Sequence, residues 1–189
     1  KIKPTRLTTR EGAALAVYVP AAALMMQTDD DLSGVYFVLA LALDPNLQVA
    51  RSLWGQSLDN AGRREEAVAV LSRIPEKSEF YATARGQMAW ALRREERNQE
   101  ALAIAGEALA HSPDRGLKIQ LADLFRSLDR DDEAERLLTE VIAEDASAGR
   151  QDWRVIYARG TTLEQTDRWL QAEADLKTAL ALQPENASI

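Results

Sequence analysis

The residues that could carry chemistry are few in this chain of 189 residues. It has no cysteine, which excludes disulfides, thiolate metal ligands and cysteine nucleophiles. Its single histidine, His111, stands just before Ser112 and Pro113. Because no second histidine or cysteine is available for a zinc cluster or an HExxH motif, we expect His111 to lie at a helix end on the surface.

Two acidic clusters, DDD at 29–31 and DRDD at 129–132, resemble calcium ligands only in composition. A calcium loop of the EF-hand type needs alternating oxygen ligands, a central glycine and a distal glutamate, and neither cluster supplies them. The many other carboxylates form no isolated acid–base couple, and the chain has no glycine-rich phosphate loop and no GxSxG motif. The sequence therefore predicts no enzyme activity, no metal site and no cofactor.

Charge and composition narrow the class of protein further. The formal net charge is −7, whereas a nucleic-acid-binding surface needs a basic face that displaces counterions from phosphates. We therefore expect no nucleic-acid partner. The longest apolar stretch, 13–26, contains Pro20 and is too short for the roughly 20 residues of a membrane span. Leu, Ala, Glu, Arg and Gln dominate, and these residues favour helices.

A repeat runs along the chain. Segments 65–75, 99–113, 132–142 and 171–184 each place an alanine shortly after a Glu or Gln, with an apolar residue four positions later. The spacings between these alanines are 34, 33 and 38 residues, and Ser33 takes the same place 34 residues earlier. The four anchoring alanines are Ala67, Ala101, Ala134 and Ala172.

A second periodic segment precedes each anchor. It has a small residue 12 positions before the anchor and a larger apolar residue three positions after that. Each unit therefore predicts two amphipathic helices of roughly 11–16 residues, joined by a short polar turn whose Asp or Asn caps the second helix. Prolines follow the second helix, where they stop it. The small residues are Ala21, Gly55, Ala89, Ala122 and Gly160, and the prolines are Pro45, Pro113 and Pro184.

This pattern resembles the tetratricopeptide repeat of bacterial type, a 34-residue helix–turn–helix unit with the signature W-x₂-L-G-x₂-Y…A-x₃-F…P. Five units in register cover about 14–186. The resemblance implies an all-α fold, a right-handed superhelical solenoid of antiparallel helix pairs. Two features depart from the pattern: Pro20 should kink its helix, and the loop at 144–152 carries about four extra residues.

We expect one array over 1–189, with an N-terminal extension at 1–13. The predicted repeats are approximately 14–47, 48–81, 82–114, 115–147 and 153–186. Within each pair, the small residue of the first helix should face the anchoring alanine of the second, where a bulky side chain would overpack the contact. Trp54 and Trp169 occupy core-like positions, and Trp153 should start its helix.

The resemblance also implies a concave groove lined by outward residues of the first helices. Trp90 is the strongest binding candidate, because tryptophan and arginine are favoured at binding hot spots; the alternative is that it packs between adjacent first helices. The family's carboxylate clamp needs lysines and asparagines where this chain has Gln56, Trp90 and Asp123, so we do not expect a chaperone cofactor of that type. The groove candidates are Tyr18, Gln56, Trp90, Arg93, Asp123, Arg126 and Tyr157.

The sequence therefore predicts a non-enzymatic scaffold that binds a peptide or protein segment in its groove. One alternative is a structural assembly module that forms homo-oligomers through its C-terminal end, because no polar capping helix follows the fifth unit. Another is an accessory domain of a larger exported or enzymatic protein, of which this chain is a piece. Localisation stays open between cytoplasm and periplasm; the last three units resemble repeat blocks of larger bacterial proteins, some exported, which leans to the periplasm.

Overall fold

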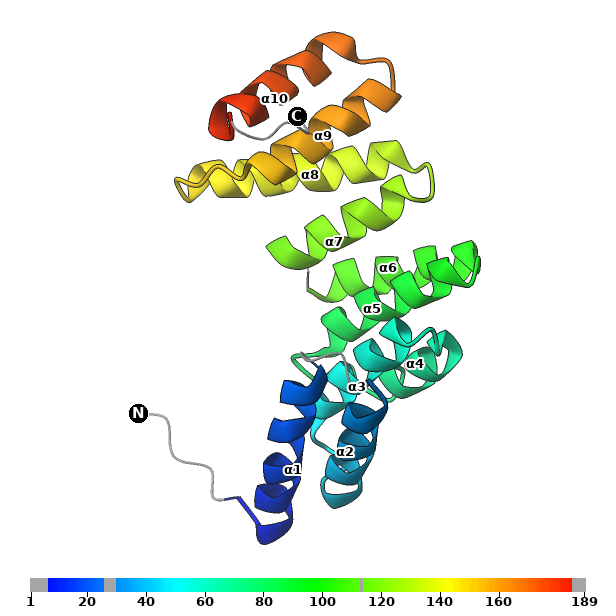
Figure 1. Ribbon diagram of the computed structural model, residues 1–189. Helices are drawn as coiled ribbons and strands as arrows, with labels where there is room; N and C mark the ends of the chain where they lie inside the picture. The colour runs from blue at the N-terminus through cyan, green and yellow to red at the C-terminus, as the bar shows by residue number, and fades with distance from the viewer. Residues whose placement is uncertain (1–6, 26–29, 113, 185–189) are drawn as a thin grey trace. The chain divides into compact units, whose positions relative to one another are not determined.

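The computed structural model describes residues 7–25, 30–112 and 114–184, and every regular element in these ranges is an α-helix. This confirms the predicted all-α class. Within residues 1–108 and within residues 109–189, consecutive helices run antiparallel to one another (Figure 1). In chain order they are α1 (Thr9–Met25), α2 (Asp30–Leu43), α3 (Gln48–Asn60), α4 (Arg64–Leu71), α5 (Tyr81–Arg94), α6 (Asn98–His111), α7 (Arg115–Arg126), α8 (Asp131–Ser147), α9 (Trp153–Gln165) and α10 (Trp169–Leu182).

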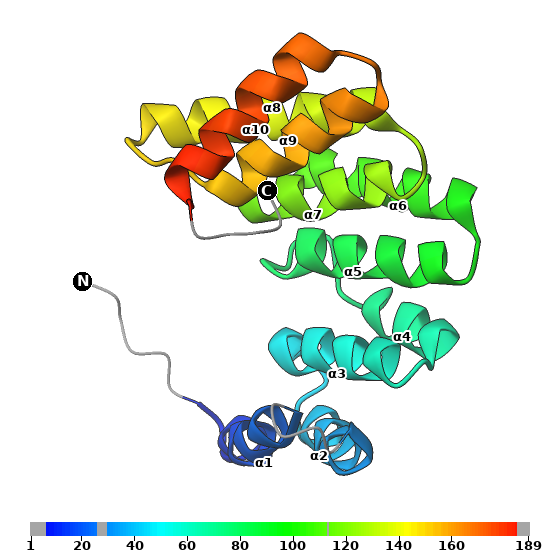
Figure 2. The ribbon, with the colours of Figure 1, turned by 45° about the horizontal axis from the view of Figure 1, so that its top comes forward.

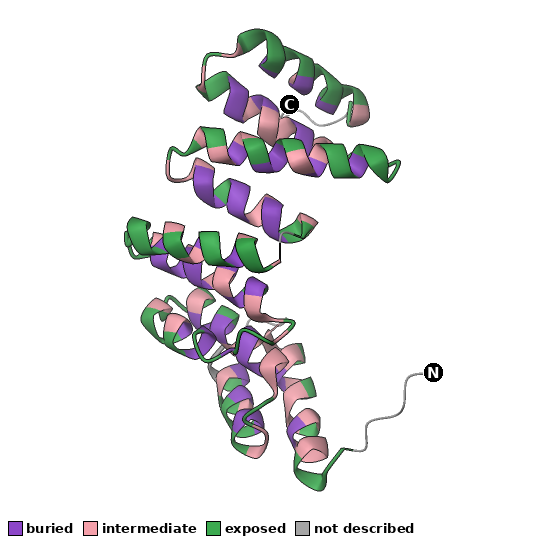
Figure 3. Cartoon of the chain, turned by 180° about the vertical axis from the view of Figure 1, so that it is seen from behind, coloured by how far each residue is buried: buried purple, intermediate pink, exposed green. Residues whose placement is uncertain are grey.

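The chain divides into two compact units, residues 1–108 and 109–189. In the first unit, α1 packs on α2 and α3 on α4, while α2 also contacts α3, and α4 contacts α5. In the second unit, α7 packs on α8 and α9 on α10, with α8 in contact with α9. We call the odd-numbered helices first helices and the even-numbered ones second helices. Buried residues lie on the inner sides of the pairs, and α6 and α10 keep one exposed side (Figure 3).

Helix bounds depart from the sequence expectation at three places. The first helix begins at Thr9, inside the range expected as an extension, and it continues past Pro20. At only eight residues, α4 is shorter than predicted. By contrast, α8 continues to Ser147, so residues 144–147 are helical and not part of a loop. Because one helical turn holds about 3.6 residues, this added turn takes up the longer spacing between the fourth and fifth units.

The four described turns inside helix pairs, from the second pair to the fifth, share one backbone design. The residue before the second helix is an arginine, and its N–H donates to the carbonyl oxygen five residues earlier, at 2.8–2.9 Å. This bond closes the first helix in the manner of a Schellman motif. The donor and acceptor pairs are Arg63 with Leu58, Arg97 with Leu92, Arg130 with Phe125, and Arg168 with Leu163.

The residue before each of these arginines has a left-handed backbone. Gly62 reaches φ 77° without strain, whereas Glu96, Asp129 and Asp167 adopt φ between 55° and 60° at some cost. The arginines of α4, α8 and α10 hold the N-cap position without a side-chain cap hydrogen bond. The prediction that Asp or Asn caps these three helices was therefore wrong: Gly62, Asp129 and Asp167 take the left-handed position in these turns instead.

The guanidinium groups of these arginines pair with carboxylates. Arg63 contacts Glu66 at 2.7 Å and Arg97 contacts Glu100 at 2.6 Å, both across one turn of the second helix. Arg130 pairs with Glu133 in the same way. Arg168 instead reaches Glu135 of α8 at 2.5 Å, because residue 171 is glutamine. In three of these turns the arginine therefore pairs with the first turn of the second helix, whereas Arg168 joins the turn before α10 to α8.

The closest approach within a helix pair is between a small residue and a leucine. A Cβ added to Gly55 would lie 2.4 Å from Leu71 Cγ, and one added to Gly160 would lie 3.0 Å from Leu176 Cδ2. Each leucine stands four residues after an anchoring alanine, so in these two pairs the atoms nearest to the small residue belong to that leucine and not to the anchoring alanine. The glycine forms a hole that the leucine fills, and the anchoring alanines Ala67 and Ala172 are buried beside it.

Gly55→Ala should therefore destabilise the chain even though alanine is the better helix former. Leu71 is fully buried and cannot move away, so overpacking of about 1–3 kcal/mol outweighs a propensity gain of about 1 kcal/mol. Gly106→Ala in α6 is the matched control, because an added Cβ there has nothing within 4 Å. Urea unfolding followed by circular dichroism should show lower stability for Gly55→Ala and higher stability for Gly106→Ala. Equal gains at both positions would contradict the close contact.

Candidate functional site

In the first unit, α3 and α5 lie side by side (Figure 2), and their outward residues form one surface. Gln56 of α3 is exposed, whereas Trp90 and Arg93 of α5 are partly exposed. The neighbours of Trp90 in sequence, Met88, Ala89 and Leu92, are buried, so the indole lies at the edge of the core.

Arg94 connects these two helices, and sequence reasoning did not select it. Its guanidinium carbon lies 5.7 Å from the centre of the Trp90 ring, within the range of a cation–π contact. The same guanidinium forms an ion pair with Asp59 of α3. Arg64 also approaches Asp59 at 3.9 Å and pairs with Glu95 at 3.0 Å. Arg93 and Arg94 both follow Leu92, and the repeat pattern could not show which of the two arginines connects the helices.

Tyr18 lies elsewhere in the first unit. Its ring packs at 6.5 Å from that of Phe37, and both belong to a core cluster with Ala21 and Leu41. Its remaining surface borders a hollow of about 860 Å³ between residues 44–49 and residues 75–80. Tyr18 therefore combines a packing role with access to a hollow at the loop edge of the helices.

In the second unit, Arg126 forms the corresponding bridge between first helices. Its Nη2 donates to Thr161 Oγ1 of α9 at 2.9 Å, and its Nη1 lies 3.6 Å from Asp123 on its own helix. Partial burial raises the pKa of Asp123, while Arg126 acts in the opposite direction. Tyr157 is partly exposed on α9. The structure therefore brings Asp123 and Arg126 together with Thr161.

The residues assigned to repeat positions lie as follows. The small residues Ala21, Gly55, Ala89, Ala122 and Gly160 are buried in first helices, and the anchors Ala67, Ala101, Ala134 and Ala172 are buried in second helices. Pro45 and Pro184 stand two residues after α2 and α10. Pro113 and Asp29 of the first acidic cluster lie outside the described residues. His111 is the last residue of α6, as expected of a helix-end histidine.

Two of the three tryptophans with a predicted structural position lie where the sequence analysis placed them, and Trp169 does not. Trp54 packs against two core clusters, and Trp153 is the first residue of α9, as predicted. Trp169 is 59% exposed at the start of α10, so its assignment to the core was wrong. It is the first residue of α10 and borders a hollow together with Glu164 of α9 and Leu176 of α10.

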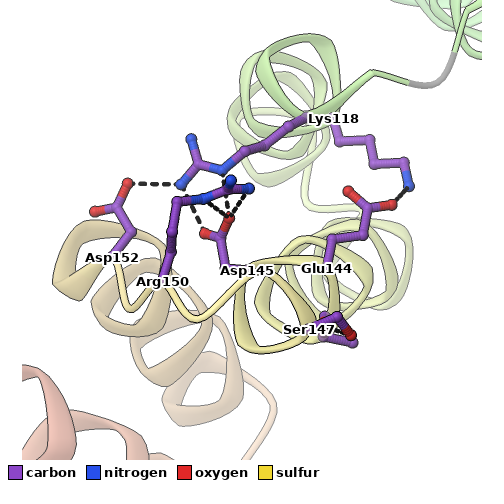
Figure 4. A network of polar contacts seen from close by, with 8 residues as sticks. Lys118, Glu144, Asp145, Ser147, Arg150 and Asp152 are labelled. Atoms are coloured by element: carbon purple, nitrogen blue, oxygen red, sulfur yellow. Dashed lines mark hydrogen bonds and ion pairs between the residues drawn. The ribbon is translucent and has the colours of Figure 1, made fainter.

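The densest charge network of the described residues joins α7, the end of α8 and the loop before α9 (Figure 4). Arg115 donates to both carboxylate oxygens of Asp145, at 2.8 and 2.7 Å, and to Asp152 at 2.8 Å. Arg150 donates to Asp145 Oδ1 at 2.9 and 3.1 Å. Since Asp145 is buried in the added turn of α8, this network holds the fourth and fifth pairs together.

The hydrogen bonds and ion pairs of this network shift the pKa values of its members. The hydrogen bonds from Arg115, with further help from Arg150, lower the pKa of Asp145 to about 2 against the opposing effect of burial. They also raise the pKa of Arg115. Beside them, Lys118 lies between Glu144 at 2.5 Å and Glu140 at 3.0 Å, and the hydrogen bond to Glu144 raises its pKa. Each shifted group has an ion-pair partner, so structural pairing accounts for the shifts.

Comparison with known proteins shows the fold. No protein-family model and no curated protein sequence matches this chain. Among solved structures, MamA 41-end from Desulfovibrio magneticus RS-1 is 12% identical with a TM-score of 0.72, over 96% of this chain and 99% of that one. The putative kinesin light chain repeats of Podosopora anserina, described as TPR-like, are 13% identical with a TM-score of 0.76, over 96% of this chain and 100% of that one. YrrB, described as a TPR protein with an unusual peptide-binding site, is 18% identical with a TM-score of 0.65, over 92% of this chain and 88% of that one.

These likenesses confirm a fold like that of tetratricopeptide repeat proteins. None of the described helices is both long and apolar enough to cross a membrane. Across the described part of the chain, no three His, Asp or Glu side chains gather in a way that could hold a metal ion.

Asp145→Asn should destabilise the chain by about 2 kcal/mol at pH 7. Removing one partner of a fully buried ion pair costs about 3–5 kcal/mol, and the half-exposed Arg150 reduces that figure here. Because folding lowers the pKa of Asp145 from about 3.9, its contribution is complete above pH 4 and is lost as the pH falls through about 2. Urea unfolding from pH 7 to pH 2 measures both effects.

Asp167→Asn is the control for this prediction, because Asp167 is exposed in a turn and asparagine tolerates its left-handed backbone. The stability difference between Asp145→Asn and the unchanged chain should narrow between pH 4 and pH 2, whereas Asp167→Asn should stay near neutral throughout. A difference for Asp145→Asn that is constant down to pH 2 would contradict the assigned ion pairs.

Proposed function

We propose that this chain is a non-enzymatic scaffold that binds a peptide or protein segment on the outward surface of its first helices. The observation that carries the proposal is Trp90, a partly exposed indole beside the arginine–aspartate bridge of α3 and α5. The likeness to YrrB, whose description names a peptide-binding site, supports it. We also propose a partner other than nucleic acid, because the net charge of −7 opposes binding to phosphates.

Trp90 has the properties of a binding anchor. An indole combines a large apolar face with an N–H donor, and tryptophan is enriched among residues that dominate binding energy. Met88 and Leu92 fix the α5 backbone in the core, and Arg94 lies over the ring. Binding to such a fixed surface loses less conformational entropy than binding to a mobile one.

Arg94 and Arg126 are engaged in contacts between helices, whereas the sequence analysis expected groove arginines to bind the partner directly. Arg94 and Arg126 each bridge two consecutive first helices, Arg94 to Asp59 and Arg126 to Thr161. We propose that they stiffen the surface, while Gln56 and Tyr157 add a polar and an aromatic contact beside them. Together with Asp123, Arg93 and Tyr18 these residues are the candidate contacts, each within its own compact unit.

Trp90→Ala should weaken peptide binding without unfolding the chain. Peptides are first selected from a displayed random library against the unchanged chain, and their affinities are then measured by fluorescence anisotropy. Loss of an aromatic anchor of about 2 kcal/mol predicts roughly 30-fold weaker binding. Because Trp90 is partly exposed, the unfolding midpoint in urea should move little.

Trp169→Ala is the matched control, since Trp169 is exposed on a second helix. It should leave the affinity of the selected peptides unchanged. Peptides that bind Trp90→Ala normally and lose affinity for Trp169→Ala would contradict the proposal.

A second candidate function is assembly through the end of the array. Trp169 and Leu180 of α10 are exposed, and with Leu176 they border a hollow of about 280 Å³. The corresponding face of α8 is covered by α9, which shows that this side of a second helix accepts another helix. The exposed face of α10 is therefore suited to a further helix.

Leu180→Lys tests this second function. If α10 mediates assembly, the mass measured by light scattering should rise with concentration for the unchanged chain and stay constant for the variant. Leu182→Lys probes the same end of α10 from a less exposed position. Unchanged self-association in both variants would exclude assembly through α10.

A further inference from the structure

One buried charge of the first unit differs from the other buried charges. Among the described residues, the buried charged side chains are those of Arg51, Lys118, Asp145 and Asp175. The lysine pairs with two glutamates, and each aspartate is held by at least one arginine. Arg51, in the first turn of α3, forms no ion pair with any described carboxylate. Because a buried charge without a counter-charge is costly, this guanidinium group points to a missing partner.

The contacts of Arg51 satisfy only part of its guanidinium group. Its Nη2 donates to the Pro45 carbonyl oxygen at 2.7 Å, and within the described ranges its buried Nε has no hydrogen-bond acceptor. An arginine has five N–H donors, and a carbonyl oxygen carries no full negative charge to balance them. Since Arg51 is only 9% exposed, water can supply few of the missing acceptors. The group therefore lacks both a counter-charge and acceptors.

A second arginine lies near this group. Arg73 follows α4 by two residues and is exposed. Burial lowers the pKa of Arg51, and the positive charge of Arg73 adds to this effect. Across the described part of the chain, Arg73 has no carboxylate at ion-pair distance either. Two guanidinium groups therefore lie close enough to repel each other, in a chain whose net charge is −7.

The start of α3 adds positive potential at the same place. The helix follows Leu47, whose side chain forms no cap hydrogen bond, and the N-terminal end of a helix dipole is positive. The carboxylate nearest in sequence is that of Asp44, which accepts the Asn46 N–H. The start of α3 and the turn after α4 therefore present two cations that no described carboxylate neutralises.

We propose that Arg51 and Arg73 form a binding site for a carboxylate group. Guanidinium groups match a carboxylate with paired N–H donors, and partial burial strengthens such hydrogen bonds. A bound carboxylate supplies the missing counter-charge of Arg51 and offsets its repulsion from Arg73. A monoanion suits the site better than a phosphate dianion, because the chain as a whole is acidic. The source of the carboxylate is an acidic side chain of a protein partner or a small free acid.

Titration with acetate tests the site without any peptide, and therefore independently of peptide binding at Trp90. The Nε–H signals of the arginines are followed by nuclear magnetic resonance while sodium acetate replaces sodium chloride at constant ionic strength. The signals of Arg51 and Arg73 should shift together and saturate, because one carboxylate contacts both side chains. Arg154 is the internal control: it is exposed on α9, stacks on Trp153 and pairs with no described carboxylate. Its signal should shift less and without saturation.

Arg73→Ala should weaken acetate binding about tenfold, the loss expected for one hydrogen bond to a charged group. Because Arg73 is exposed, the variant should remain folded by far-UV circular dichroism, and the Arg51 signal then reports the weaker binding. Arg154→Ala is the matched variant and should leave the affinity for acetate unchanged.

A pair of peptides distinguishes the two sources of the carboxylate. A library-selected peptide that contains a glutamate is compared with the same peptide carrying glutamine. If the glutamine peptide binds the unchanged chain more weakly, and this difference disappears in Arg73→Ala, the carboxylate comes from a protein partner. Acetate binding without such a difference assigns the site to a free acid. Signals of Arg51 and Arg73 that stay unmoved by acetate, or that shift only as the Arg154 signal does, would overturn the proposal.

Discussion

The fold depends on how closely the two helices of a pair approach. At Gly55 and Gly160 the first helix has no side chain, and a leucine of the second helix fills the space. This contact sets the distance within the pair, and buried apolar residues on either side extend it. No single pair buries its apolar faces alone, so neighbouring pairs must stack. The remaining features, the turns and the outward surfaces, are arranged around that contact.

Repetition made most of the fold predictable from the sequence. The register of Ala67, Ala101, Ala134 and Ala172 gave the helix pairs because small residues must recur where helices meet. It could not show that leucine and not alanine faces the glycine, since both recur at fixed spacing. The left-handed turn residues were also beyond the pattern, because glutamate and aspartate rarely adopt that backbone. The sequence analysis assigned the added turn of α8 to a loop, because the repeat pattern could not show that Asp145 pairs with Arg115 and Arg150.

The candidate site was less predictable than the fold. Periodicity placed Trp90 and Arg126 on outward faces, but it could not say which guanidinium groups were already engaged. The structure shows Arg94 and Arg126 as bridges between first helices, so the candidate contacts beside them include Trp90, Gln56 and Tyr157. A rigid surface with one prominent indole suits recognition of a short segment more than chemistry.

The most direct test of the peptide-binding account is a nuclear magnetic resonance titration of the chain with a selected peptide. The four tryptophans give four indole N–H signals, and the structure places Trp54 in a core, Trp153 and Trp169 at helix starts, and Trp90 on the first-helix surface. The account predicts that the Trp90 signal shifts most strongly as peptide is added. A shift of the Trp169 signal with that of Trp90 unchanged would contradict it.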